Sequence, residues 1–136
     1  MLAQQPSPDP EDGRLPLRVL IVDDMASMRF LLEANLALDR DCRLVGQAEN
    51  GAEALEMIES LHPDLVVMDI QMPVMDGMTA TREIRKRWPS IEVVGFSSAR
   101  HPSDRADLMA AGAVESFDKR DIRPLIDFVQ ARARRG

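Results

Sequence analysis

Short, uninterrupted runs of apolar residues divide this chain at regular intervals, and they restrict the fold more than any other feature. The runs at 19–22 and Leu65–Met68 contain only valine, leucine, isoleucine and methionine, without the alternation of a half-exposed strand. Continuous apolar runs of this length are typical of strands buried on both faces, as in parallel sheets. Three further segments have the composition of strands, the last of them more polar: Cys42–Ala48, residues 91–96 and residues 114–118.

Segments with helical periodicity lie between and after these predicted strands. In the first segment, four apolar side chains fall on one side of a helix and are predicted to face the core. They are Met28, Leu31, Leu32 and Leu36. The remaining helices are predicted at Gly51–Leu61, Gly77–Arg87, residues 103–111 and residues 124–134. This alternation predicts an α/β fold, namely a (βα)₅ doubly wound, five-stranded parallel sheet with right-handed crossovers and helices on both faces.

Composition and charge exclude several other classes of protein. The 136 residues include 17 basic and 23 acidic side chains, a net charge of −6, so direct binding of nucleic acid through a basic face is not expected. The single cysteine, Cys42, excludes an intramolecular disulfide framework. The apolar runs are far shorter than the roughly 20 residues that cross a bilayer, and the N-terminus lacks the apolar core of a secretory signal. We therefore expect a cytoplasmic protein that does not bind membranes, with a proline-rich, mobile tail at 1–16 and one domain at 17–136.

Polar side chains that could carry chemistry follow four of the predicted strands. In a parallel sheet the carboxyl ends of the strands meet at one edge, where such folds bind ligands. The side chains are Asp23 and Asp24 after the first strand, Asp69 after the third, Ser97 at the fourth and Lys119 after the fifth. Three carboxylates gathered there would repel one another and favour a hard cation such as Mg²⁺. A free aspartate can then attack a phosphoryl group whose oxygens are held by a hydroxyl and an ammonium group.

Each of these residues also has an ordinary structural interpretation. An aspartate pair after a strand often caps the next helix, and a serine at such a place often closes a turn. A lysine at a sheet edge is often only solvated. What favours a site is the joint placement of all five residues at the ends of four strands.

The sequence around Asp69 resembles a known family. Residues 65–77, LVVMDIQMPVMDG, are similar to the phosphoacceptor segment of the receiver domains of two-component response regulators, a chemotaxis-regulator-like superfamily. The match continues, in order, through residues 22–24 (VDD), 46–51 (GQAENG), Ser97, 111–113 (AGA) and Lys119. The resemblance covers about residues 17–134 and implies a flavodoxin-like fold.

The resemblance also implies a role for the acidic residues. Asp69 corresponds to the aspartate that accepts a phosphoryl group from a histidine kinase or a histidine phosphotransfer protein. Asp23 and Asp24, together with Asp69 and the backbone carbonyl of Gln71, correspond to the family's Mg²⁺ ligands. Apart from self-phosphorylation and self-dephosphorylation at Asp69, the resemblance implies no enzymatic activity.

Two further residues resemble the family's phosphoryl-binding groups, but the sequence around one of them departs from the family. Ser97 and Lys119 correspond to the hydroxyl and the ammonium group that bind the phosphoryl oxygens. Arg120 follows the lysine where the family often has proline, and Ser116 stands at the switch position, where the family usually has an aromatic residue. Phe117 is one residue along and is therefore predicted to point to the other face of the sheet.

Without an aromatic at the switch position, a muted structural response to phosphorylation is expected, led by the loop at 99–102. Two phenylalanines outside the inward helix stripes are predicted as exposed partner contacts. Phe30 belongs to the first helix, through which the family meets its phosphodonor partners, and Phe128 belongs to the last helix.

The leading functional hypothesis is a stand-alone receiver that signals by phosphorylation-dependent binding of a downstream protein, as a monomer or weak dimer. It rests on the end of the chain directly after the last predicted helix. One alternative is the receiver half of a DNA-binding transcription regulator, which the sequences at 45–48 and 96–97 resemble. A remote alternative is a small Mg²⁺-dependent phosphatase with an aspartate nucleophile. The haloacid dehalogenase family places a DxD motif after its first strand, and residues 23–25 lack that spacing.

Overall fold

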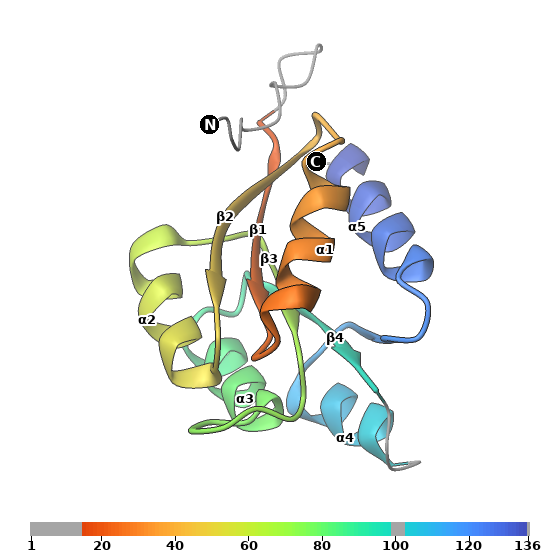
Figure 1. The fold of residues 1–136 in the computed structure, drawn as a ribbon. Coiled ribbons are helices and arrows are strands. Elements are labelled where there is room, and N and C mark those ends of the chain that lie inside the picture. The colour runs from red at the N-terminus through yellow and green to blue at the C-terminus, as the bar shows by residue number, and fades with distance from the viewer. Residues whose placement is uncertain (1–14, 99–102, 136) are drawn as a thin grey trace.

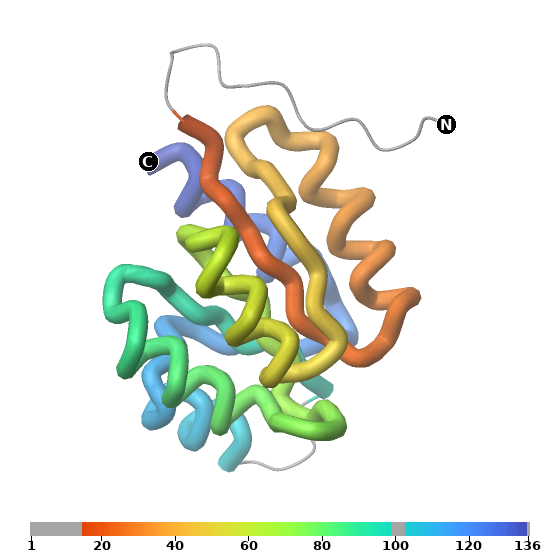
Figure 2. The backbone as a smooth tube through the Cα atoms, turned by 90° about the vertical axis from the view of Figure 1, so that its left-hand side faces the viewer, coloured from red at the N-terminus to blue at the C-terminus, as the bar shows by residue number. Residues whose placement is uncertain are grey.

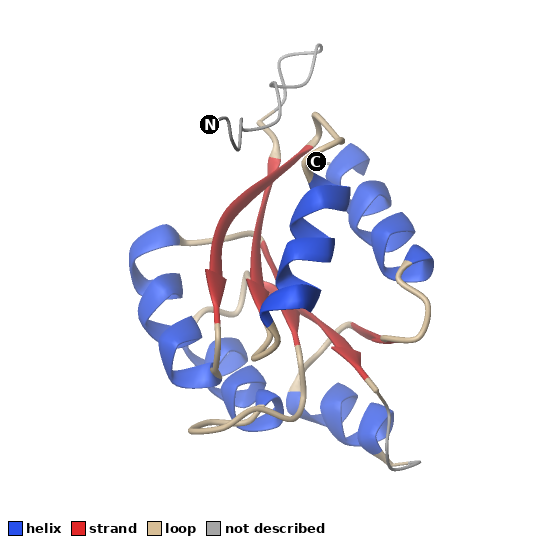
Figure 3. Ribbon diagram, in the orientation of Figure 1, coloured by secondary structure: helices blue, strands red, loops and turns tan. Residues whose placement is uncertain are grey.

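The computed structural model describes residues 15–98 and 103–135. Within these ranges five strands alternate with five helices, which confirms the predicted (βα)₅ fold (Figure 1; Figure 3). The elements are β1 (Leu17–Val22), α1 (Ala26–Leu36), β2 (Cys42–Ala48), α2 (Gly51–Leu61), β3 (Leu65–Met68), α3 (Gly77–Arg87), β4 (Glu92–Ser97), α4 (Asp104–Ala111), β5 (Glu115–Asp118) and α5 (Arg123–Arg135). The predicted tail at 1–16 lies outside the described residues except for its last two positions.

The five strands form one parallel sheet in the order β2-β1-β3-β4-β5. The first strand is therefore an interior strand, with β2 on one side of it and β3 on the other. This is the point at which the strand order reverses, so the loops after β1 and β3 leave the sheet next to each other. The more polar β5 lies at the edge of the sheet, where one of its sides is unpaired.

Helices cover both faces of the sheet, as Figure 1 and Figure 2 show. Along β1, Val19 and Ile21 pack with α1 and α5, whereas Leu20 and Val22 pack with α2 and α3. All four side chains are at most 1% exposed, which confirms the interpretation of the continuous apolar run as a strand buried on both faces.

One prediction for α1 is wrong. Leu31 was predicted to face the core, but its side chain is 42% exposed, whereas Leu32 and Leu36 are buried. Side chains at i and i+4 lie above one another on a helix, so Leu32 and Leu36 form the stripe that contacts the sheet. Leu31 is rotated by about 100° from Leu32 and lies on the flank of that stripe.

The segment that connects β3 to α3 is tightly held at both ends. The backbone amide of Gly77 donates to the carbonyl of Ile70 at 2.7 Å, and the amide of Gly51 donates to the carbonyl of Met75 at 3.0 Å. A Cβ atom at position 77 would lie 1.9 Å from the carbonyl oxygen of Asp69, so only glycine fits there. This close approach fixes the backbone that follows Asp69.

Val74 at the tip of the same segment has the left-handed conformation, with φ at 71°, and its side chain is 84% exposed. A β-branched residue is strained in this conformation, whereas asparagine tolerates it. We expect Val74→Asn to increase the free energy of unfolding by about 0.5–1 kcal/mol, measured by urea denaturation. Val114→Asn, at another exposed valine without positive φ, should give no such gain. Equal effects of the two substitutions would contradict the prediction.

Candidate functional site

Three carboxylates meet at the carboxyl edge of the sheet. Asp23 and Asp24 follow β1, Asp69 follows β3, and one carboxylate oxygen from each lies within 4.8 Å of the others. Asp23 and Asp69 are buried, whereas Asp24 is exposed to solvent. Backbone hydrogen bonds hold the two buried residues, because the amide of Asp69 donates to the carbonyl of Val22 and that of Asp23 donates to the carbonyl of Ala48. The structure thus brings together the three acidic residues predicted to meet.

Lys119 lies between the two buried carboxylates. Its Nζ is 2.7 Å from Oδ2 of Asp23 and 3.1 Å from Oδ2 of Asp69. The lysine side chain is only 13% exposed, so it is held in the site rather than solvated at the edge of the sheet. Its backbone amide donates to the carbonyl of Ser97 at 2.9 Å, which places the buried Ser97 at the same edge.

The electrostatics of the site reflect an excess of negative charge. Burial raises the pKa of Asp69 to about 6; the charges of Asp23 and Asp24 raise it as well, while Lys119 lowers it. Burial alone lowers the pKa of Lys119, but its hydrogen bond to Asp23 and the charges of both buried aspartates outweigh this effect, so that pKa is raised. The ammonium group of Lys119 therefore contacts two of three carboxylates, and the negative charge that remains favours a divalent cation.

One contact at the site was missed by the sequence analysis. Nη1 of Arg29, on the first turn of α1, donates to the backbone carbonyl of Asp23 at 2.6 Å, while the amide of Met25 donates to Oδ1 of Asp23 at 2.9 Å. Together these bonds fix the turn that carries the acidic pair. The sequence feature that could have indicated this contact is the position of Arg29, one helical turn into the helix that follows Asp23 and Asp24.

The residues around the switch position are arranged differently on the two faces of β5. Ser116 is half-buried and lies opposite Gly95 of β4. A Cβ atom added to Gly95 would lie 2.0 Å from Cδ2 of Leu108 and 3.0 Å from Oγ of Ser116. Leu108 of α4 thus occupies the space beside Ser116. Phe117 packs on the other face, against the core beneath α1 and α5, as predicted. The expected response of the loop at 99–102 lies outside the described residues.

The two predicted partner contacts differ in exposure. Phe30 of α1 is 69% exposed, in agreement with the prediction. The prediction that Phe128 is exposed is wrong, because it is half-buried and its ring centroid lies 5.5 Å from that of Phe117. The ring of Phe128 therefore packs against Phe117 of the edge strand instead of facing the solvent.

A known family matches this chain over most of its length. The family model described as the response regulator receiver domain matches residues 19–130. This chain belongs to the receiver domain family. Receiver domains act in two-component signalling, where they are phosphorylated on an aspartate, bind Mg²⁺ at an acidic pocket, and interact with histidine kinases and downstream effectors.

The curated relatives are longer proteins. A protein-glutamate methylesterase/protein-glutamine glutaminase from Methanosarcina acetivorans is 44% identical over 101 residues, which is 73% of this chain and 29% of that protein. One from Pseudomonas aeruginosa is 40% identical over 107 residues, 77% of this chain and 29% of that protein. This receiver domain therefore spans less than a third of the length of the curated relatives it matches.

Solved receiver domains have the same fold. The response regulator domain of Thermotoga maritima CheB is 31% identical with a TM-score of 0.78, over 88% of this chain and 95% of that chain. The signal receiver domain of the response regulator NarL from Mycobacterium tuberculosis is 28% identical with a TM-score of 0.80, over 88% and 97% of the two chains. In residues 15–98 and 103–135 of this receiver domain, no helix is long and apolar enough to cross a membrane.

Proposed function

We propose that this receiver domain accepts a phosphoryl group on Asp69 from a histidine kinase or a histidine phosphotransfer protein. The observation that carries the proposal is the buried Asp23–Lys119–Asp69 arrangement, with distances of 2.7 and 3.1 Å. In the transfer, a carboxylate oxygen of Asp69 forms a bond to phosphorus while the bond from phosphorus to the donor's imidazole nitrogen breaks. The chain catalyses no reaction other than the gain and loss of its own phosphoryl group.

The acidic residues fit a bound Mg²⁺. Oxygen atoms from three carboxylates within 4.8 Å of one another are the hard ligands that this ion takes, and the exposure of Asp24 leaves one side open to water and phosphate. We assign the ligands to Asp23, Asp24, Asp69 and the backbone carbonyl of Gln71. When bound, the ion would neutralise the charge on the phosphoryl oxygens during transfer.

Lys119 and Ser97 would bind the transferred group. The phosphoryl group adds roughly 1.5 to 2 negative charges beside an ammonium that already contacts the acceptor carboxylate at 3.1 Å. Lys119 therefore exchanges part of its contact with Asp69 for a phosphoryl oxygen. Ser97, buried at the end of β4, supplies a hydroxyl donor at the same edge.

The direct test is incubation of the full chain with acetyl phosphate and Mg²⁺, followed by intact-mass and peptide mass spectrometry. We expect the mass of one phosphate on the peptide that contains Asp69, lost on treatment with hydroxylamine, which cleaves acyl phosphates. A phosphate on serine or threonine, or none under conditions that label a known receiver, would refute the proposal.

The assignment of Asp24 predicts a change in metal affinity. In Asp24→Asn, the Mg²⁺ concentration needed to raise the melting temperature should increase about tenfold, since one charged ligand is lost. Without metal, the variant should be at least as stable as the wild type, because like-charge repulsion is reduced. Asp107→Asn, at an exposed acid on α4, should leave the Mg²⁺ response unchanged. Equal Mg²⁺ responses of Asp24→Asn and the wild type would contradict the assignment.

Phe30 is proposed as a contact for the protein phosphodonor, because it is the large apolar side chain on α1 that is 69% exposed. Phe30→Ala should slow transfer from a phosphorylated histidine kinase or phosphotransfer protein about tenfold and leave acetyl phosphate labelling unchanged. Leu38→Ala is the matched control, since Leu38 is 88% exposed but lies beyond the other end of the helix. Equal slowing with both donors would reject this role for Phe30.

For the output, we propose phosphorylation-dependent binding of a downstream protein by the receiver acting alone. A second candidate is a receiver linked to an effector domain, which the greater length of the curated methylesterase relatives favours. Immunoblotting of the native host with an antibody against this domain separates them. A band near 15.2 kDa supports the first candidate, and a much larger band supports the second.

A further inference from the structure

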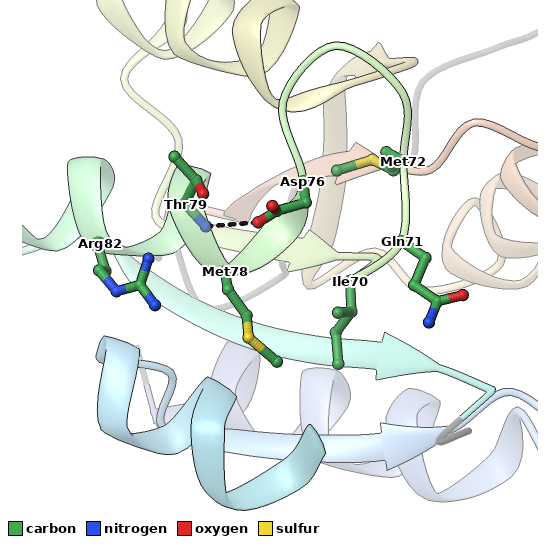
Figure 4. Close-up of a pocket in the computed structure, with 7 residues that line it drawn as sticks. All are labelled: Ile70, Gln71, Met72, Asp76, Met78, Thr79 and Arg82. Atoms are coloured by element: carbon green, nitrogen blue, oxygen red, sulfur yellow. Dashed lines mark hydrogen bonds between the residues drawn. The ribbon is translucent and has the colours of Figure 1, made fainter. Parts of the chain in front are cut away.

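A shallow pocket of about 420 Å³ lies beside the phosphorylation site, between the start of α3 and the segment before it. Figure 4 shows Ile70, Met78 and Arg82 on the same side of this region, the side of β4 and α4. The pocket does not include Asp23, Asp69 or Lys119. Its lining residues are Ile70, Gln71, Met72, Asp76, Met78, Thr79 and Arg82.

The floor of this pocket is apolar and adaptable. Ile70 is 6% exposed and belongs to a small cluster with Leu108 and Ala113. Met78 and Met109 are partly buried against the same cluster. Methionine side chains are unbranched and can adjust to different apolar groups, so such a floor accepts an inserted aliphatic or aromatic side chain.

Two basic side chains lie along the side of α3 that borders the pocket, one of them in its lining. Arg82 and Lys86 are exposed on α3, four residues apart and therefore on the same side of the helix. Neither side chain makes a hydrogen bond or an ion pair within residues 15–98 and 103–135. By contrast, Arg85 on the same helix donates to two backbone carbonyls, and Arg87 contacts Glu59 at 3.4 Å.

Unpaired basic residues stand out on a chain whose net charge is −6. On β5, α5 and the turn between them, four other arginines are paired with carboxylates: Arg120, Arg123, Arg132 and Arg134. The negative residue on the rim of the pocket, Asp76, is already engaged, since its Oδ1 accepts the amide of Thr79 at 2.8 Å and caps α3. The charge of Asp76 thus stays at the N-terminus of α3, and the basic groups available to pair with an acidic ligand are those of Arg82 and Lys86.

We propose that this pocket and the adjacent side of α3 dock an acidic segment of a partner protein. An apolar side chain of the segment enters between Ile70 and Met78, and flanking carboxylates pair with Arg82 and Lys86. Carboxylates three or four residues apart on a partner helix match the spacing of the two basic residues. The surface extends the proposed function, because it binds a partner without using the residues that accept the phosphoryl group.

The test uses a fluorescein-labelled helical peptide of about 16 residues, with leucines flanked by glutamates on one face. Fluorescence anisotropy with the full chain should show saturable binding that weakens as salt is added. Arg82→Glu should weaken the affinity about tenfold or more. Arg135→Glu, at an exposed arginine on the last turn of α5, carries the same charge change and should alter affinity less than twofold.

Peptide controls complete the test. Replacing the leucines with serine or the glutamates with lysine should abolish binding, and amide chemical shifts should move at residues 70–72 and 76–82. The proposal is overturned by a lack of saturable binding, by equal losses in Arg82→Glu and Arg135→Glu, or by shifts confined to another face. Equal binding of the lysine peptide or of a single-stranded oligonucleotide would overturn it as well.

Discussion

Asp69→Asn is expected to abolish phosphorylation by acetyl phosphate and by a protein donor, because the amide oxygen is a poor nucleophile while the shape of the side chain is kept. The loss should exceed about a thousandfold, limited by detection, and is measured by intact-mass spectrometry. Asp107→Asn, at an exposed acid on α4, is the matched control and should retain labelling. Labelling of Asp69→Asn at the wild-type rate would refute the assignment of the acceptor.

The same substitution should change how stability depends on pH in metal-free buffer. The pKa of Asp69 is about 6 in the folded protein and 3.8 for a free aspartate, so between these pH values the folded protein holds a proton that the unfolded chain has released. Stability therefore falls as pH rises from about 4 to 6, by about 3 kcal/mol in total. In Asp69→Asn this slope should disappear, and urea denaturation at pH 7.5 in chelator should show a more stable protein. A wild-type slope retained by the variant would contradict the raised pKa.

Lys119→Met is expected to have the second large effect. It leaves the carboxylates of Asp23 and Asp69, whose side chains are 2% and 6% exposed, without their shared cation. Removing one partner of such a buried pair costs about 3–5 kcal/mol of unfolding free energy, because the remaining charge is uncompensated. Millimolar Mg²⁺ should restore part of this loss, and the rate of phosphorylation should fall about 100-fold even in saturating Mg²⁺.

Lys86→Met is the control for this variant, since Lys86 is exposed on α3 and unpaired within the described ranges. It should leave stability and labelling within error of the wild type. If Lys119→Met is as stable as the wild type in the presence of chelator, the lysine does not compensate the two aspartates. If it is labelled at the wild-type rate, the lysine does not bind the phosphoryl group.

The local pattern of the sequence was enough to predict most of the fold. From β2 to α5, each strand and helix begins and ends within one residue of its predicted bounds. The apolar runs that form strands are continuous, and residues that end a helix, such as Pro89 after Trp88 at the end of α3, are easily recognised. The joint position of the acidic residues followed from the parallel sheet, since the ends of such strands share one edge. The roles of individual residues came from the family resemblance.

The remaining features depend on contacts between elements that are distant in sequence. Helical periodicity placed Phe128 outside the inward stripe, but only the packing of β5 beside α5 brings it onto Phe117. The charge that Lys119 shares between Asp23 and Asp69 follows from three loops meeting in space. The unpaired state of Arg82 is equally a property of the folded surface, since an acidic residue, Glu83, lies next to it in the sequence.

Lys119 has a further consequence as a cation that the chain itself carries into the site. Its ammonium group binds two of the carboxylates that a dissolved cation would bind. Because the chain tethers this group next to them, its effective concentration at the site is high. The occupancy of the site by magnesium is therefore a competition, and the position of the turn after β5 sets the strength of the competitor. Because β5 is an edge strand with one free side, a protein that binds there and draws Lys119 outward would increase metal affinity without touching any of the aspartates.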